Sequence, residues 1–206
     1  MNCLLCHTPD TDLFCDAFKC SHCGLVFKNP NVFATTEKEL ARYLTHQNNS
    51  EDLGYINFLK QLINPLTQFL APSFSLLDYG CGPGPTLSIL MEKLGGKVHN
   101  FDPLFHPDKE LLNVKYDVVT STEVVEHFKN PAESWEELIN LVKPNALLAI
   151  MTLFLNEDVD YKSWWYKNDM THIVFYNQKT FNFLAEKFNL EILFNDSKSV
   201  LIFRKK

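Results

Sequence analysis

The chain of 206 residues carries 19 Lys and Arg against 25 Asp and Glu, which gives a formal net charge of −6. Proteins that bind a nucleic-acid backbone usually present a basic face, so this balance disfavours RNA or DNA as a partner without excluding a local basic patch. The most apolar segment has about ten residues, too few to span a bilayer, and no membrane partner is expected.

Four cysteines near the amino terminus form two pairs, each with two residues between its members, and thirteen residues separate the pairs. Thiolates at this spacing are typical of tetrahedral zinc sites. The predicted zinc ligands are Cys3, Cys6, Cys20 and Cys23. His7 and His22 adjoin the pairs and could substitute as ligands, whereas Cys15 lies outside the spacing. We predict a zinc-ribbon-like domain over residues 1–30.

A disulfide framework is the alternative for these cysteines. It fits poorly, because the chain begins without a charged-then-apolar signal peptide and holds two more cysteines elsewhere. A reducing compartment, the cytoplasm, is therefore expected. Four thiolates leave no open coordination position, so the zinc is predicted to be structural and to stabilise a segment too short to fold alone. The ribbon could still recognise a substrate.

Residues 31–68 are predicted to form a helical linker or lid. Thr36, with Glu39 three residues on, is typical of a helix start, and Ser50 is predicted to cap a second helix that runs toward Pro65. A polar stretch separates the helices and forms either a lid over a ligand or a solvated loop. The side chains expected to face a pocket are Tyr43, His46 and Tyr55.

A glycine-rich turn follows the next apolar run. Residues 76–79 read as a buried strand, glycines stand at positions 80, 82 and 84, and apolar residues at helical spacing follow from Pro85. This order of strand, turn and helix is typical of a Rossmann-type nucleoside site. The dinucleotide fingerprint needs its third glycine where this chain has Pro85, so a nicotinamide-dependent oxidoreductase is disfavoured. Asp102, after a second short strand, stands where a ribose-binding carboxylate is expected.

The acid at Asp78, the Gly-x-Gly-x-Gly turn and the acid at Asp102 resemble the first motifs of class I S-adenosylmethionine-dependent methyltransferases. The resemblance implies that S-adenosylmethionine is the cofactor and that the turn lies against its methionine part. It also implies that Asp78 orients the amino end of the cofactor and that Asp102 holds the ribose hydroxyls. The expected cofactor contacts are Asp78, Gly80, Cys81, Gly82, Gly84, Asp102, Pro103, Leu104, Thr120, Ser121 and Thr122.

The downstream segments reproduce the order of that family. Apolar runs at 116–121 and 146–152 read as buried parallel strands, with an amphipathic helix between them. The stretch between Asp102 and Tyr116 is too short for the family's usual helix, third strand and second helix. The third strand is therefore predicted to be missing or vestigial, and the adenine is expected against Leu104, Phe105 and the end of the fourth strand.

The chain closes with an amphipathic helix near 180–188 and two strands, 190–194 and 200–203, whose polar connection predicts a hairpin. We therefore expect an α/β fold, a Rossmann-like methyltransferase sheet with helices on both faces, a missing or vestigial third strand and a C-terminal antiparallel hairpin. The methyltransferase core is predicted over residues 69–206.

Candidate catalytic residues lie in two places. The aromatic segment 164–176 follows the fifth strand, where this fold presents substrate, and its Asp169 and His172 suit a general base with a supporting acid. His172 is the leading candidate base. The alternative is that Asp169 caps the segment while His172 packs or bonds to the backbone.

Glu123, Glu126 and His127 form the rival cluster, because residues three and four apart share a helix face. Their segment resembles ubiquinone-biosynthesis O-methyltransferases and many small-molecule relatives. That resemblance implies that these residues line the acceptor site, with or without a divalent cation. The alternative is that they only begin and anchor a helix.

Together these patterns predict methyl transfer from S-adenosylmethionine to a small-molecule acceptor by in-line displacement, with positioning as a main source of acceleration. An RNA methyltransferase guided by the zinc ribbon is one alternative. Many enzymes that methylate base amino groups have an acidic or polar residue followed by two prolines after the fourth strand. This chain has Ser-Thr-Glu-Val there, at residues 121–124, which argues against the RNA alternative. A noncatalytic protein that keeps the fold is the second alternative. The acceptor atom, whether oxygen, nitrogen or carbon, and the oligomeric state stay open.

Overall fold

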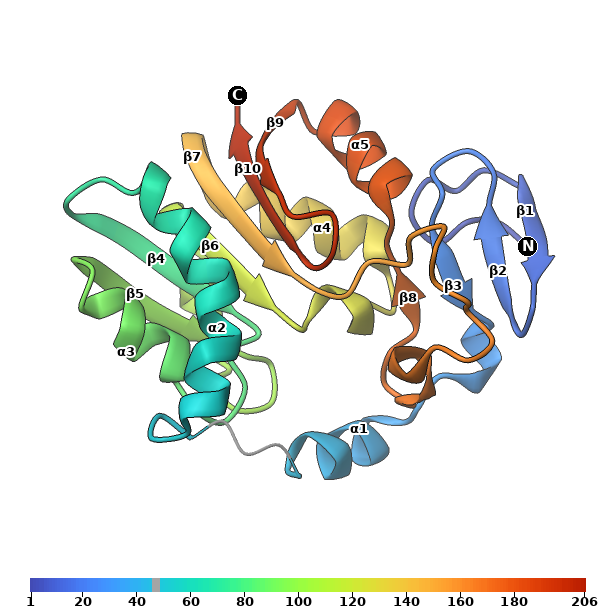
Figure 1. Ribbon diagram of the computed structural model, residues 1–206, viewed down its shortest axis with the longest axis horizontal. Coiled ribbons are helices and arrows are strands. Elements are labelled where there is room, and N and C mark those ends of the chain that lie inside the picture. Colours follow the sequence, from blue (N-terminus) through green and yellow to red (C-terminus); the bar gives the residue numbers. More distant parts are fainter. Residues whose placement is uncertain (46–48) are drawn as a thin grey trace.

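The computed structural model describes residues 1–45 and 49–206. A central six-stranded sheet has the order β5-β4-β6-β7-β10-β9, with helices on both faces (Figure 1). Its strands are β4 (Phe74–Tyr79), β5 (Gly96–Phe101), β6 (Tyr116–Thr122), β7 (Val142–Met151), β9 (Leu190–Asn195) and β10 (Val200–Lys205). Strands β5, β4, β6 and β7 run parallel, and β10 is antiparallel to both β7 and β9. The predicted Rossmann-like sheet with a C-terminal hairpin is confirmed.

The central strands β4, β6, β7 and β10 are mostly buried on both faces, which explains their long apolar runs, whereas the edge strands β5 and β9 are only partly buried. Adjacent side chains alternate between two cores: Leu76 and Val118 pack on one side, and Leu77 and Val119 pack on the other. The helices are α1 (Thr36–Tyr43), α2 (Leu53–Leu66), α3 (Thr86–Glu92), α4 (Pro131–Asn140) and α5 (Gln178–Lys187). Helices α2 and α3 contribute to the first core, while α4 and α5 contribute to the second.

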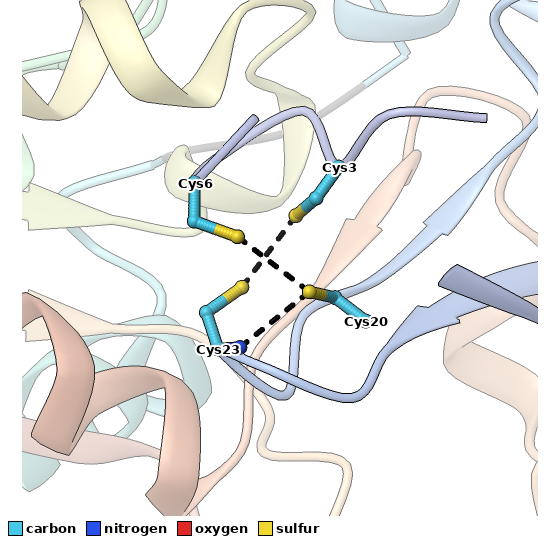
Figure 2. A group of neighbouring side chains, drawn as sticks. All are labelled: Cys3, Cys6, Cys20 and Cys23. Carbon is cyan, nitrogen blue, oxygen red and sulfur yellow. Dashed lines mark hydrogen bonds between the residues drawn. The ribbon is translucent and has the colours of Figure 1, made fainter. Parts of the chain in front are cut away.

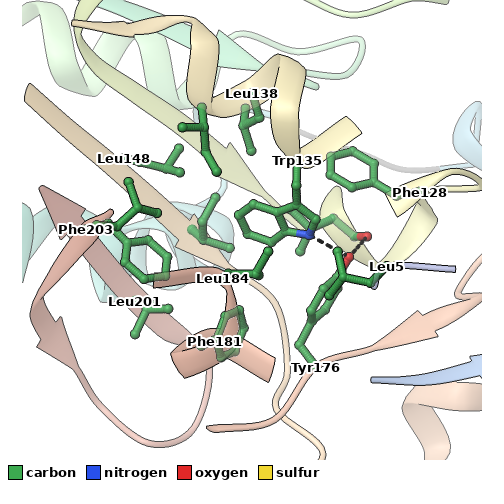
Figure 3. Packing of buried hydrophobic residues seen from close by; sticks show 14 of the residues in the cluster. Leu5, Phe128, Trp135, Leu138, Leu148, Tyr176, Phe181, Leu184, Leu201 and Phe203 are labelled. Carbon is green, nitrogen blue, oxygen red and sulfur yellow. Dashed lines mark hydrogen bonds between the residues drawn. The ribbon is translucent and has the colours of Figure 1, made fainter. Parts of the chain in front are cut away.

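Trp135 is the centre of the second core and is fully buried (Figure 3). Its indole N–H donates a hydrogen bond of 3.1 Å to the hydroxyl of Tyr176, which donates one of 2.9 Å to the backbone carbonyl of Val125. Because both polar groups are satisfied, the aromatic pair is buried without a desolvation penalty from an unpaired donor. The chain of bonds fixes the segment just after β6 against α4 and the strand β8 (Val174–Phe175).

The segment between β5 and β6 contains no strand in the part of the chain that the structure describes. Asp102 and His106 form an isolated antiparallel bridge, and a short 3-10 helix covers Lys109–Asn113 before β6 begins. The prediction of a missing third strand is therefore confirmed. The physical reason is length, since a parallel crossover needs about a dozen residues or more on each side of an inserted strand.

Two predicted helix caps were wrong by one or two residues. Helix α1 begins after Thr35, not Thr36, and Glu39 extends to Lys129 instead of back to the cap. Helix α2 begins after Asp52, not Ser50, because the Asp52 carboxylate accepts from two orphan N–H groups of the first turn. Within residues 1–45 and 49–206, no helix combines the length and the apolar character needed to cross a membrane.

The amino-terminal ribbon shares a sheet with the rest of the molecule. Strands β1 (Thr11–Phe14), β2 (Ala17–Cys20) and β3 (Val26–Lys28) continue into β8 through an antiparallel pairing of β3 with β8 (Figure 1). Leu5, Leu25 and Phe27 belong to the same core as Trp135. The ribbon is thus packed into the second core, and the proposed divisions of the chain after residues 30 and 68 stay predictions from sequence.

Candidate active site

A cavity of ≈ 1210 Å³ opens at the carboxyl ends of β4, β5 and β6. Its wall runs from the glycine-rich turn at Gly80 past Asp102 to Glu123 and His172, with α1 and α2 along one side. This is where open α/β sheets bind ligands. A pocket for a single drug-sized ligand measures about 300–1,000 Å³, so the cavity has room for a cofactor and a second molecule.

Two glycines shape the turn after β4. Gly80 and Gly82 have φ angles of +79° and +66°, in the region where a side chain is strained. A Cβ atom on Gly80 would also collide with the side chain of Val124. The backbone N–H groups of Gly80 and Cys81 both donate to the carbonyl of Phe101, at 2.7 and 3.2 Å, which ties the turn to the end of β5.

Asp102 connects this turn to the loop after β5. One carboxylate oxygen accepts from the N–H of Gly82 at 3.1 Å, and the other accepts from the N–H groups of Leu104 and Phe105 at 2.8 and 3.1 Å. Asp102 also lines the cavity. Its carboxylate therefore holds the turn in shape, a role that the sequence did not reveal, in addition to the predicted contact with a ribose.

Asp78 lies one layer behind the turn, with only 2% of its surface exposed. The hydroxyl of Thr120 donates to its carboxylate at 2.9 Å. Burial raises the pKa of Asp78 to about 7, against the opposing effect of that hydrogen bond. Asp78 itself does not line the cavity, so its predicted role in orienting the amino end of a cofactor stays a prediction.

The predicted cofactor residues fall into two groups. Those that line the cavity are Gly80, Cys81, Gly82, Asp102, Pro103, Leu104 and Thr122. Those outside its lining are Asp78, Gly84, Thr120 and Ser121. Asp78, Thr120 and Ser121 lie within β4 and β6, and Gly84 lies in the turn before α3; any contact of either group with a cofactor stays a prediction.

The two predicted catalytic segments meet at the far end of the cavity. The ring nitrogens of His127 and His172 and a carboxylate oxygen of Glu126 lie within 4.8 Å of one another. His127 Nδ1 is 2.8 Å from the carbonyl of Thr171, and His172 Nδ1 is 2.8 Å from the carbonyl of Tyr166. A carbonyl only accepts, so each Nδ1 carries a proton, and a ring in the neutral form keeps its lone pair on Nε2. Burial lowers the pKa of His172, which favours this neutral form.

Buried acids surround these histidines. The hydroxyl of Tyr166 donates to Glu126 at 2.6 Å and lies 3.1 Å from Glu123. Burial, reinforced by the charge of Glu126, raises the pKa of Glu123 well above its ordinary value. Glu123 also has a φ of +53°, which is strained for a residue with a side chain and is typical of functional positions. Tyr166 was not singled out from sequence, because only its aromatic neighbourhood signalled a pocket.

Asp169 lines the cavity but is already engaged. Its carboxylate accepts from the N–H and hydroxyl of Thr171, at 2.9 and 2.7 Å, and from two nitrogens of Arg42, at 2.9 and 2.8 Å. Burial alone would raise the pKa of Asp169, but these bonds hold it well below the ordinary range. The geometry matches the capping alternative, and Asp169 anchors both the loop that carries His172 and helix α1.

Helix α1 covers the end of the cavity where His127 and His172 lie. Besides the Arg42 pair, Glu39 on α1 pairs with Lys129 at 2.8 Å. The ring of Tyr43 packs edge-on against His127, and Tyr55 of α2 also lines the cavity. Both tyrosines thus lie where a lid residue was predicted, whereas His46, the third such prediction, lies outside the described residues.

The four predicted zinc ligands meet in the ribbon (Figure 2). Their sulfur atoms all lie within 4.8 Å of one another, and the Cys3–Cys23 and Cys6–Cys20 separations are both 3.5 Å. A disulfide would place two sulfurs about 2.05 Å apart, so these cysteines are not bridged. Sulfurs bound tetrahedrally to one zinc ion, each about 2.3 Å from the metal, would be separated from one another by a distance close to that observed. The contact between the Cys3 and Cys23 sulfurs lowers the pKa of Cys3 to about 5. The donor set fits a tetrahedral zinc ion.

The ribbon also holds the loop that carries His172. The N–H of Lys28, at the end of β3, donates to the carbonyl of Ile173 at 2.8 Å, and the N–H of Ile173 donates to the carbonyl of Glu126 at 2.9 Å. The Lys28 ammonium donates to the carbonyls of Lys167 and Asp169 at 2.8 and 3.1 Å. Burial lowers the pKa of Lys28. A continuous path of hydrogen bonds therefore links the ribbon to the loop that carries His172.

Comparison with known proteins agrees with this class of fold and site. A family model described as a methyltransferase domain, Methyltransf_23, matches residues 37–194, well over half of the chain. The chain therefore belongs to this family, and the predicted resemblance to class I S-adenosylmethionine-dependent methyltransferases is confirmed. No curated protein matches the sequence.

Solved structures show the same fold at low sequence identity. A candidate sarcosine dimethylglycine methyltransferase from Galdieria sulphuraria has a TM-score of 0.56 and 15% identity, over 74% of this chain and 86% of that one. The PH0226 protein from Pyrococcus horikoshii OT3 has a TM-score of 0.55 and 12% identity, over 81% and 99% of the two chains. Magnesium protoporphyrin IX methyltransferase from Synechocystis PCC 6803, solved with bound SAH, has a TM-score of 0.54 and 15% identity, over 86% and 98%.

Proposed function

We propose that the protein transfers the methyl group of S-adenosylmethionine to a hydroxyl of a small molecule. The observation that carries the proposal is one cavity that joins the glycine-rich turn and Asp102 at one end to His127 and His172 at the other. The acceptor oxygen attacks the methyl carbon, the carbon–sulfur bond breaks with its electrons on sulfur, and S-adenosylhomocysteine leaves. The hydroxyl proton passes to the histidine cluster.

A small acceptor is favoured by the shape and charge of the cavity. Helix α1 lies over the acceptor end, fastened by the Arg42–Asp169 and Glu39–Lys129 pairs. A long polymer would have to displace it. The net charge of −6 also gives little attraction for an RNA backbone. RNA methylation and noncatalytic binding are therefore the outcomes that would contradict the proposal.

A hydroxyl acceptor is favoured by the chemistry of the cluster. The sulfonium already activates the methyl group, so the protein must align the acceptor and remove its proton. His172 and His127 both line the cavity, and each ring in its neutral form offers a lone pair on Nε2. His172 is the proposed base, with Glu123 beside it and Asp169 as the residue that positions its loop.

We assign a structural zinc ion to the ribbon, held by the thiolates of Cys3, Cys6, Cys20 and Cys23. The ion would stabilise the ribbon fold and would leave no coordination position for substrate. The bonds of Lys28 then transmit that stability to the loop of His172. The zinc contributes no chemical step.

Calorimetric titration tests the cofactor. S-Adenosylmethionine, S-adenosylhomocysteine and NAD are titrated into the wild type and into Asp102→Ala, at measured zinc content. We expect micromolar binding of the first two ligands only, weakened at least tenfold in Asp102→Ala because the turn loses its clamp. Binding of NAD, or no binding by zinc-replete protein, would contradict the proposal.

A further inference from the structure

The His127, His172 and Glu126 cluster has the arrangement of a metal site. In metal-binding histidines, one ring nitrogen ligates while the other donates to a carbonyl or carboxylate that fixes the ring. Both histidines here meet that condition, because each Nδ1 is bound to a backbone carbonyl and each Nε2 is free to ligate. The carbonyls of Thr171 and Tyr166 accept these two bonds, so the same loop holds both rings.

Glu126 supplies an independent observation. Its side chain has no exposed surface, and its oxygen Oε2 has no hydrogen-bond partner among the residues that the structure describes. A buried carboxylate oxygen without a partner is costly, and a bound cation is one standard way to satisfy it. The other oxygen, Oε1, accepts from Tyr166 at 2.6 Å and lies 3.9 Å from His127 Nε2.

We infer that Glu126, His127 and His172 bind a divalent transition-metal ion at the acceptor end of the cavity. Three protein ligands leave coordination positions open, as in catalytic metal sites and unlike the closed four-thiolate site. Two imidazoles favour zinc, iron, nickel or copper over magnesium, calcium or manganese, which prefer oxygen ligands. Tyr166 would hold the carboxylate in place through its existing bond.

The inference deepens the proposed function and rests on it for the identity of the ligand. His127 and His172 line the cavity, so the open side of the ion faces the acceptor. An acceptor oxygen would occupy an open position. With both imidazole lone pairs on the ion, His172 would serve as a ligand in place of the base described above. The ion would lower the pKa of the hydroxyl, and the hydroxyl proton would leave to water before methyl transfer. The acceptor class is therefore an oxygen ligand, a hydroxyl that binds as its anion.

The test counts metal ions. Wild-type protein is brought to equilibrium with micromolar free Zn²⁺ by dialysis, and bound zinc is measured by elemental analysis. We expect about two ions per chain. Glu126→Gln, which keeps the size of the side chain, and His172→Ala should retain about one ion, because removal of a ligand weakens the site at least tenfold. Glu133→Gln, which removes an exposed cavity acid outside the cluster, should retain both.

Cobalt substitution distinguishes the two sites. Co²⁺ in the four-cysteine site gives thiolate charge-transfer absorption, whereas Co²⁺ bound to histidine and carboxylate gives only ligand-field bands. Glu126→Gln should lose the second set and keep the first. The inference is overturned if the wild type binds a single ion, or if Glu126→Gln matches the wild type in both measurements.

Calorimetric binding of S-adenosylhomocysteine to the same samples separates the two hypotheses. Retained binding shows that Glu126→Gln is folded, so its metal content can be interpreted. Two ions without cofactor binding would contradict the proposed function and leave the metal site standing. Cofactor binding with one ion would overturn the metal site and leave the proposed function standing.

Discussion

At the scale of single residues, the cavity depends on a few positions where only one side chain fits. Gly80 is the sharpest case, because it combines a φ of +79° with close contact to Val124. Asp102 is the second, since its two oxygens satisfy three backbone N–H groups. These requirements are geometric, and they explain why the motif needs these residue types.

Gly80→Ala should weaken binding of S-adenosylhomocysteine at least tenfold. A side chain at positive φ costs about 1–2 kcal/mol before the collision with Val124 is added, and about 1.4 kcal/mol already corresponds to tenfold. Calorimetry measures the affinity. Gly54→Ala is the matched control, because Gly54 lies in the first turn of the exposed end of α2. Equal affinities in the two variants would contradict the account.

Asp78 makes stability depend on pH. Its pKa is about 7 in the folded protein and 3.8 in the reference state, so the ionised form is disfavoured by folding. The stability of the wild type relative to Asp78→Asn should therefore fall as pH rises from 4 to 7, by up to about 4 kcal/mol. Chemical denaturation of both proteins across this range provides the test. A difference that does not change with pH would exclude a raised pKa.

At the scale of elements, the ribbon and the loop that carries His172 form one hydrogen-bonded unit. Strand β3 pairs with β8, and Lys28 bonds to the loop that precedes β8. Because these contacts join the ribbon to residues about 140 positions away, damage to the proposed zinc site should reach the loop of His172. Helix α1, in contrast, is held by the partly exposed Arg42–Asp169 and Glu39–Lys129 ion pairs. Such pairs contribute about 0–1 kcal/mol each to stability.

Cys20→Ser should lower the free energy of unfolding by about 4 kcal/mol or more, because loss of a structural metal is among the largest single-site effects. It should also speed hydrogen exchange at the amide of Ile173, which donates to Glu126. Cys15→Ser is the matched control, since Cys15 is an exposed cysteine outside the cluster. Unchanged exchange at Ile173 in Cys20→Ser would show that the ribbon and the loop are independent.

Local patterns predicted most elements, and long-range contacts explain the rest. The glycine turn, the buried strands and the missing third strand follow from spacing within short segments. The helix caps at Thr35 and Asp52 were missed because neighbouring residues had equal capping chemistry and only the fold selects between them. The pairing of β3 with β8 could not be predicted, since its two strands are short and far apart in sequence.

At the scale of the whole molecule, the two candidate catalytic segments turn out to be parts of one cluster. His172 and Glu126 were rivals in the sequence, where nothing places residues 46 positions apart in contact. The sheet brings the end of β6 beside the loop before β8, and Ile173 bonds to Glu126 directly. The sequence thus predicted both sets of candidate residues, but it could not predict that Glu126 and His172 lie close together, because that depends on the topology of the fold.

The cavity accordingly has two chemically distinct ends within one space. Backbone amides and Asp102 lie at one end, and imidazoles with buried acids lie at the other. A methyl donor and an oxygen acceptor need this separation, because the reacting atoms must line up while each molecule keeps its own contacts. The account predicts that loss of the acceptor end spares the cofactor end.

The most direct test is methyl transfer itself. S-Adenosylmethionine with a labelled methyl group is incubated with the zinc-loaded protein and with separated small-molecule, RNA and protein fractions of a cell extract. The account predicts label in the small-molecule fraction, at least about 100-fold less of it with His172→Ala, and unchanged binding of S-adenosylhomocysteine by that variant. Label in RNA, or transfer by His172→Ala at the wild-type rate, would contradict it.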